Sequence, residues 1–135
     1  MIDIETPVFN NVATVLRDAV SGIFFTGENV AAPPKFPAAS LVEMDNATHT
    51  RTLANMTTEN HADLMYQAEV VSNLTVGKKA QCKSIMATID TQMLGMGFTR
   101  VGSGPVELPN ADATKYRMVA RYRAVVSKEN MIYHK

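Results

Sequence analysis

The segment Lys115–Val126 alternates between apolar and polar side chains, and it constrains the fold more than any other part of the chain. Because successive side chains of a strand point to opposite faces, the segment predicts one strand with an apolar and a basic face. At ~3.3 Å per residue this strand would be about 40 Å long. The apolar face should cover the core, and the basic face should be a functional surface. The apolar face holds Tyr116, Met118, Ala120, Tyr122, Ala124 and Val126, and the other holds Lys115, Arg117, Val119, Arg121, Arg123 and Val125.

Length and charge narrow the class of protein. The chain has 135 residues, which favours a single domain over residues 1–135. It carries 13 basic and 13 acidic residues, so its formal net charge is +0 and a general affinity for nucleic acid or anionic membranes is not indicated. Cys82 is the only cysteine, which excludes an intramolecular disulfide. The first residues do not match a signal peptide, and no apolar run approaches the roughly 20 residues of a membrane helix.

Two helices and four main strands are expected. Thr6 is the expected N-cap of the first helix, with Pro7 at its first position. Gly22 marks the end of this helix, and Gly95 and Gly97 can end the second. The order α-β-β-α-β-β predicts an α+β fold, with a mixed or antiparallel sheet of about four strands and both helices packed on one face. The helices should run from Thr6 to near Gly22 and from Gly77 to near Gly97, and the strands should cover residues 38–44, 63–71, 98–101 and 115–126.

Three connecting segments have less regular patterns. Residues 45–61 are rich in Thr and Asn, which predicts either a long loop or the weakly paired tip of a hairpin. A long loop in a small domain is usually functional. Residues 102–110 are expected to turn because they contain glycine and proline, and residues 131–133 should form either a short strand or a docking tail.

No set of residues indicates catalysis or a cofactor. His49, His61 and His134 are far apart and have no partner at metal-ligand spacing, so we expect surface histidines. Cys82 lies on the apolar stripe of the second helix, which favours a buried small side chain over a nucleophile. These histidines and this cysteine therefore do not point to a catalytic or metal-binding site.

Two further motifs are also better explained without a ligand. Gly102-Ser103-Gly104-Pro105 is not followed by a helix or by a Gly-Lys-Ser/Thr ending, as a phosphate-binding loop requires. The acidic residues near the polar segment are too loosely spaced for a cation loop, so a solvated loop is the better interpretation. This acidic group comprises Glu43, Asp45, Glu59 and Asp63.

The basic face of residues 115–126 leaves three interpretations open. Arg117, Arg121 and Arg123 can form a solvated sheet face, where charges discourage unwanted strand pairing. They can form a protein interface, in which arginine is enriched relative to lysine. They can also contact nucleic-acid phosphates, although no aromatic side chain on that face and no recognised motif supports base recognition. The protein interface is the favoured interpretation.

The short N-terminal helix and several other segments together resemble the tail terminator (tail completion) proteins of long-tailed bacteriophages. The other segments are residues 35–46 (KFPAASLVEMDN), 64–73 (LMYQAEVVSN), the helix start Gly77-Lys78-Lys79, residues 96–100 (MGFTR) and the strand Tyr116 to Val126. The resemblance covers nearly the whole length. Related head–tail joining proteins of the phage neck share this size and pattern.

The resemblance implies a structural protein of the virion. It implies a mixed sheet packed against helices, and a ring of six copies that caps the tail tube and ends its polymerisation. The ring would bind the tail tube protein and the head connector, or stopper, protein, and genome DNA would pass through its lumen without sequence recognition. The expected location is the tail or neck of the virion, after assembly in the host cytoplasm, and neither cofactor nor catalysis is implied.

We assign residues to two contacts as hypotheses. A ring closes head to tail, so each subunit needs two different matching patches. The polar segment is the candidate contact with the tail tube. The main rival is a small cytosolic protein that binds nucleic acid through its arginines. The proposed subunit interface comprises Arg117, Arg121, Arg123, Glu43, Asp45 and Glu69, and the proposed tail-tube contact comprises Asn46, His49, Arg51, Asn55 and Glu59.

Overall fold

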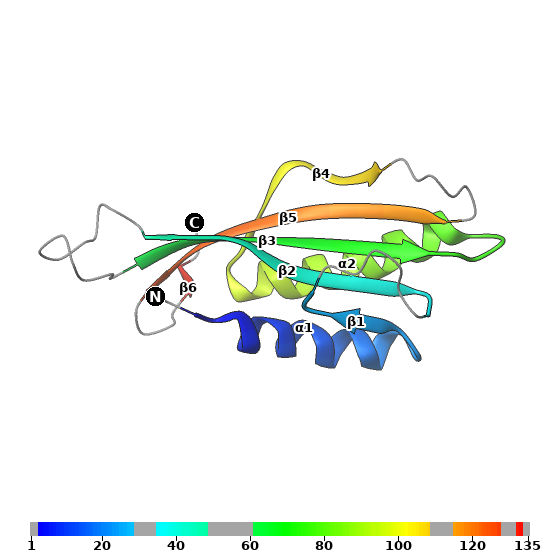
Figure 1. The fold of residues 1–135 in the computed structure, drawn as a ribbon, viewed down its shortest axis with the longest axis horizontal. Coiled ribbons are helices and arrows are strands. Elements are labelled where there is room, and N and C mark those ends of the chain that lie inside the picture. The colour runs from blue at the N-terminus through cyan, green and yellow to red at the C-terminus, as the bar shows by residue number, and fades with distance from the viewer. Residues whose placement is uncertain (1–2, 29–34, 49–60, 109–114, 128–131, 134–135) are drawn as a thin grey trace, which may run out of the picture.

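The computed structural model describes residues 3–28, 35–48, 61–108, 115–127 and 132–133, with the side chains of residues 102–108 and 132–133 excluded. It confirms the α+β fold: Figure 1 shows one long twisted sheet with both helices on the same face. The short strand β1 adds to the four expected ones, and β6 confirms the short-strand alternative for the end of the chain. The elements are α1 (Glu5–Ala19), β1 (Phe24–Thr26), β2 (Ala38–Thr48), β3 (His61–Ser72), α2 (Lys78–Met96), β4 (Thr99–Leu108), β5 (Tyr116–Ser127) and β6 (Ile132–Tyr133).

The strands lie in the order β1-β2-β3-β5-β4, and β6 pairs with β5. Only β1 and β2 are parallel, and the other pairs are antiparallel. The prediction that residues 102–110 form a turn region is wrong for the described part, because β4 runs to Leu108. Its pairing with β5 breaks after Val101 and resumes at Val106, so the glycines and the proline fall where the register shifts.

Helix α1 begins at Glu5, before the predicted Thr6 cap. Ile4 is the N-cap and offers no side-chain hydrogen bond, while the amide of Glu5 donates to Asp3 Oδ1 at 3.0 Å. The carboxylate of Asp3 thus satisfies one of the free amides at the helix start. The buried stripe of the helix contains Val8, Val12, Ala13 and Leu16.

Both ends of α2 are set by glycine, as predicted. Gly77 at the N-cap has φ 84° and Gly97 at the C-cap has φ 106°, values in the left-handed region that favours glycine. The amides of Gly97 and Phe98 donate to the carbonyls of Leu94 and Met93 at 3.1 and 3.0 Å, which closes the last turn. The buried residues of α2 are Cys82, Ile85, Met86, Ile89 and Met93, all on the predicted apolar stripe.

The core lies between the helices and one face of the sheet. The predicted apolar face of β5 is buried at all six positions, from Tyr116 to Val126. Two aromatic contacts join the layers: the rings of Tyr66 and Phe98 meet edge to face at 5.4 Å, and those of Phe9 and Phe25 stack at 4.8 Å. Buried apolar area of this kind contributes roughly 25 cal/mol per Å², so burial of this face stabilises the fold.

The β2–β3 hairpin is longer than the pattern predicted. Residues 45–48 belong to β2 and His61 belongs to β3, and pairing reaches Thr48 opposite Ala62. The remaining residues of the polar segment, 49–60, lie outside the described residues. The register shifts between Glu43 and Asp45, so these two residues point to opposite faces although they are two positions apart.

Candidate protein-contact surface

Figure 1 shows the two helices on one face of the sheet, and no described helix or strand covers the other face, here called the open face. On this open face, Arg117, Arg121 and Arg123 of β5 lie opposite Val71, Gln67 and Met65 of β3. Alternation along the strands keeps these positions away from the core, which explains why the basic face of the predicted strand is not covered. Arg121 and Arg123 are exposed and Arg117 is half-buried.

Two of the three arginines have partners on the neighbouring strand. Arg117 forms an ion pair with Glu69. The Nε of Arg121 donates a hydrogen bond to Gln67 Oε1 at 3.1 Å. The Arg117–Glu69 pair is partly buried, whereas the Arg121–Gln67 bond is exposed and contributes only about 0–1 kcal/mol. Both contacts orient the arginine side chains across the sheet.

Carboxylates share the open face with the arginines. Asp45 and Asp63 lie on the same face as Glu69, because each alternates with the core positions of its strand. At the described positions of β2, β3 and β5, the carboxylates of Asp45, Asp63 and Glu69 therefore share the face with three guanidinium groups. The basic stripe of one strand therefore belongs to a face of balanced charge, and half-buried aliphatic side chains separate the charges. These are Val42, Met65, Val119 and Val125.

Glu43 does not lie on the open face, so the structure separates it from the arginines and from Asp45 and Glu69 of the proposed subunit-interface set. It points to the helix side of the sheet, where the hydroxyl of Tyr66 donates to Glu43 Oε1 at 3.2 Å. Burial raises the pKa of Glu43, and repulsion from Glu5 and Asp3 raises it further, against the hydrogen bond from Tyr66. Sequence reasoning missed this contact, because partners 23 positions apart leave no local pattern.

The raised pKa of Glu43 predicts a pH-dependent effect of Glu43→Gln. A carboxyl group whose pKa rises on folding destabilises the folded state when it is ionised. This destabilisation disappears as the pH falls through the pKa of the folded state to below that of the unfolded state. Glutamine keeps an acceptor for Tyr66 without the charge. We expect the variant to be more stable than the wild type at pH 7, by less than about 1 kcal/mol. Urea unfolding at pH 7 and pH 3.5 measures this, and an unchanged difference at the two pH values would contradict it.

A second polar group joins α2 to the sheet. Asp90 Oδ1 accepts a hydrogen bond from the Tyr122 hydroxyl at 2.9 Å and pairs with Arg100 Nη1 at 2.7 Å. Burial, followed by the bond to Asp90, raises the pKa of Tyr122, so this hydroxyl stays protonated and keeps donating. The cluster joins α2 to β5 and β4.

The described residues contain no group of three metal-ligating side chains close enough to hold an ion. Cys82 is buried, as predicted, with Sγ 3.4 Å from the Tyr116 carbonyl oxygen, and burial raises its thiol pKa to about 11. A protonated, covered thiol is a poor nucleophile. His61 lies in β3, while His49 and His134 lie outside the described residues.

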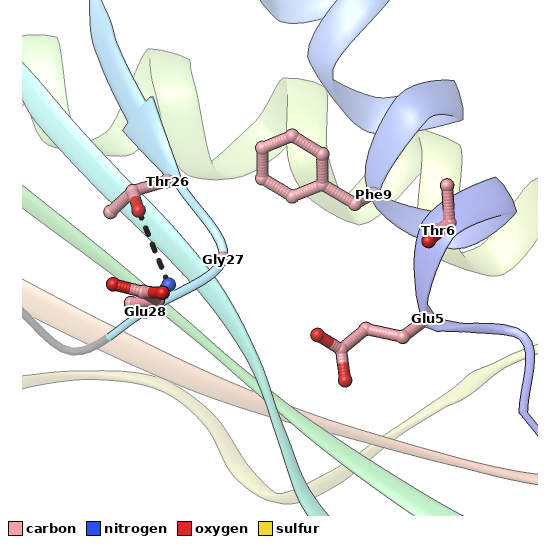
Figure 2. A pocket seen from close by; sticks show the side chains of 6 residues that line it. All are labelled: Glu5, Thr6, Phe9, Thr26, Gly27 and Glu28. Carbon is pink, nitrogen blue, oxygen red and sulfur yellow. Dashed lines mark hydrogen bonds between the residues drawn. The ribbon is translucent and has the colours of Figure 1, made fainter.

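A hollow of about 280 Å³ lies between the start of α1 and the end of β1. Figure 2 shows the carboxylates of Glu5 and Glu28 on opposite sides of the hollow, with the ring of Phe9 above them in the view. The amide of Glu28 donates to Thr26 Oγ1 at 3.2 Å, which holds the chain in place after β1. The hollow concentrates negative charge at the β1 side of the sheet.

Of the proposed tail-tube residues, only Asn46 is described. It lies in β2 opposite Leu64 and so faces the helix side of the hairpin rather than a loop tip. His49, Arg51, Asn55 and Glu59 lie outside the described residues, and their role stays a prediction.

No protein-family model matches the chain, and no curated protein matches it. Among the described residues, neither helix has the length and apolar character needed to cross a membrane.

Proposed function

We propose that this protein is a structural component of a phage neck. Copies assemble into a ring, of six subunits by resemblance to tail terminators, that caps the tail tube and ends its polymerisation. The ring then offers the surface to which the head connector attaches, and genome DNA passes through its lumen. The adjacent head–tail connector role uses the same kind of subunit and is the nearest alternative.

The open face of the sheet is the observation that carries this proposal. Both described helices lie on the same side of the sheet, and the opposite face mixes aliphatic side chains with oriented charges. Arginine beside partly buried aliphatic residues is typical of protein contacts, in which opposite charges fix the register. These features fit a subunit whose open face is in contact with neighbouring subunits.

The same face argues against the rival nucleic-acid function. Binding to phosphates needs uncompensated positive charge. Here Glu69 pairs with Arg117, and Asp45 and Asp63 lie on the same face. The rival function predicts salt-sensitive DNA binding by the isolated monomer, whereas we expect little DNA binding and self-assembly in contact with tail tubes.

Reversing the charge of Arg121 and Arg123 tests the proposed use of the open face. Both side chains are exposed, so Arg121→Glu/Arg123→Glu should fold normally. The face would change from balanced to strongly acidic, and like charges across a contact cost several kcal/mol. We expect the ring to dissociate at concentrations at which the wild type is assembled. Multi-angle light scattering measures the mass of the particle.

The matched control makes the same change of charge away from the sheet. Arg17→Glu/Lys79→Glu alters one exposed residue on each helix. It should leave the ring intact. A ring of unchanged mass in the Arg121→Glu/Arg123→Glu variant would show that the open face does not contribute to assembly.

A further inference from the structure

The sheet ends in two unlike strands whose outer edges have no hydrogen-bonded neighbour among the described residues. Strand β1 pairs only with Ala38–Ser40 of β2, so the rest of β2, to Thr48, is open on that side. Strand β4 is the last strand at the opposite side. Open strand edges carry unpaired amides and carbonyls, which makes them templates for pairing with another chain.

The strand directions allow one edge to pair with the other. Neighbours in the series β2, β3, β5 and β4 are all antiparallel, so β2 and β4 run in opposite directions. A rotation about an axis along the strands keeps these directions. It can bring β2 of one copy beside β4 of the next as an antiparallel pair that continues the sheet. Repeating the rotation gives a head-to-tail arrangement that closes into a ring.

Charge distinguishes this pairing from a contact between two identical edges. The β2 side carries five carboxylates, whereas the β4 side carries Lys83 and Arg100, partly offset by Asp90. Pairing β2 with β2 would bring the carboxylates together, whereas pairing β2 with β4 brings opposite charges together. One row of paired residues crosses the sheet from Glu43 through Tyr66 and Tyr122 to Arg100. Arg100 therefore lies in this row at the β4 edge, which faces the neighbouring subunit. The five carboxylates are those of Asp3, Glu5, Glu28, Glu43 and Asp45.

The two edges also match in shape and apolar character. Met44, the residue at the register shift of β2, is 48% exposed. Beside β4 lies a hollow of about 320 Å³, whose lining includes Met86, Ala87 and Met118. Methionine is flexible and adapts to irregular apolar gaps, so an exposed methionine on one edge suits a hollow on the other.

We propose that the open edge of β2, from Val42 to Thr48, pairs antiparallel with β4 of the next copy, so that the sheets of neighbouring subunits become continuous. This inference rests on the proposed ring and specifies how its subunits join. The acidic β2 side meets the basic β4 side, and the open face of balanced charge runs from subunit to subunit.

Engineered disulfides test the pairing directly. Asp45 and Thr99 are exposed, lie on the open face and belong to one row across the sheet. Facing residues of paired strands have Cα atoms about 4.5–5.5 Å apart, within the range that a disulfide spans. The Asp45→Cys/Thr99→Cys variant, oxidised mildly after assembly on tail tubes, should give a ladder of crosslinked species up to the full ring on non-reducing gels. Asp45→Cys/Val101→Cys tests the neighbouring register, since Val101 is the next open-face position of β4, and buried Cys82 stays outside the reaction.

The controls separate this inference from the proposed ring. Each single-cysteine variant should give no species larger than a dimer, and Asn11→Cys/Lys79→Cys, with both sites exposed on the helices, should give no ladder. A ring visible by electron microscopy without a ladder from either edge pair would overturn the edge pairing and leave the ring proposal standing. Ladders from the Asn11→Cys/Lys79→Cys variant, in a yield equal to that of the edge variants, would also overturn the edge pairing. A chain that stays monomeric on tail tubes would overturn both.

Discussion

Replacing Tyr122 with alanine is expected to lower the free energy of unfolding by about 3–5 kcal/mol, the range for truncating large buried aromatic side chains. Tyr122 is fully buried at the centre of β5, between the helix layer and the sheet. The truncation leaves a cavity and also removes the hydroxyl that donates to Asp90. Because a domain of this kind is stable by only about 5–15 kcal/mol, the variant should lose a large share of its stability. Urea denaturation at pH 7 measures the loss.

Two further variants divide this effect into packing and hydrogen bonding. Tyr122→Phe keeps the ring and removes only the hydrogen bond to Asp90 Oδ1, so we expect a loss of about 1.5–3 kcal/mol. Arg123→Ala changes the next outward position of the same strand, which is exposed, and should stay within about 0.5 kcal/mol of the wild type. Equal losses in Tyr122→Ala and Arg123→Ala would contradict the placement of Tyr122 in the core.

Replacing residues 50–60 with Asn-Gly is expected to leave the fold intact and give phage tails of uncontrolled length. Strands β2 and β3 are paired as far as Thr48 and Ala62, so a two-residue turn closes the shortened hairpin in register. The variant lacks the proposed contacts of Arg51, Asn55 and Glu59 with the tail tube. Without that contact the ring would not cap the tube, and polymerisation would continue.

Electron micrographs of lysates from phage carrying the shortened hairpin measure tail length directly. A matched control replaces Arg51, Asn55 and Glu59 with serine and keeps the length of the segment. The same long tails in this control would assign the contact to those side chains. Tails of normal length in the Asn-Gly variant, with the fold confirmed by circular dichroism, would contradict the assignment to this segment.

The parts of the fold that follow from local pattern were predictable. Strand β5 alternates so regularly that its core face was predicted residue by residue, because the period of two is a property of the strand itself. Helix α2 was similarly clear, since Gly77 and Gly97 supply the left-handed conformations at its two ends. The start of α1 was less predictable: Thr6 and Pro7 are a strong local signal, yet Asp3 holds the first turn two residues earlier.

The extent of β4 shows where local pattern fails. Gly102, Gly104 and Pro105 predict a turn, but pairing with β5 carries the strand past them with a shift in register. An edge strand tolerates such residues because one of its sides needs no partner. Only the tertiary structure supplies the neighbouring strand that outweighs the local preference.

The sequence by itself determined which side chains of each strand face the core, since alternation and helical spacing are written into the order of residues. It could not determine which charges would share a surface. The register shift after Glu43 sends that carboxylate to Tyr66 and leaves Asp45 with the arginines, and pairing across β3 joins Glu69 to Arg117. These contacts join residues 23 and 48 positions apart, so they exist only once the strands are in register. The basic stripe of one strand is therefore part of a face of balanced charge, and this balance is a property of the assembled sheet.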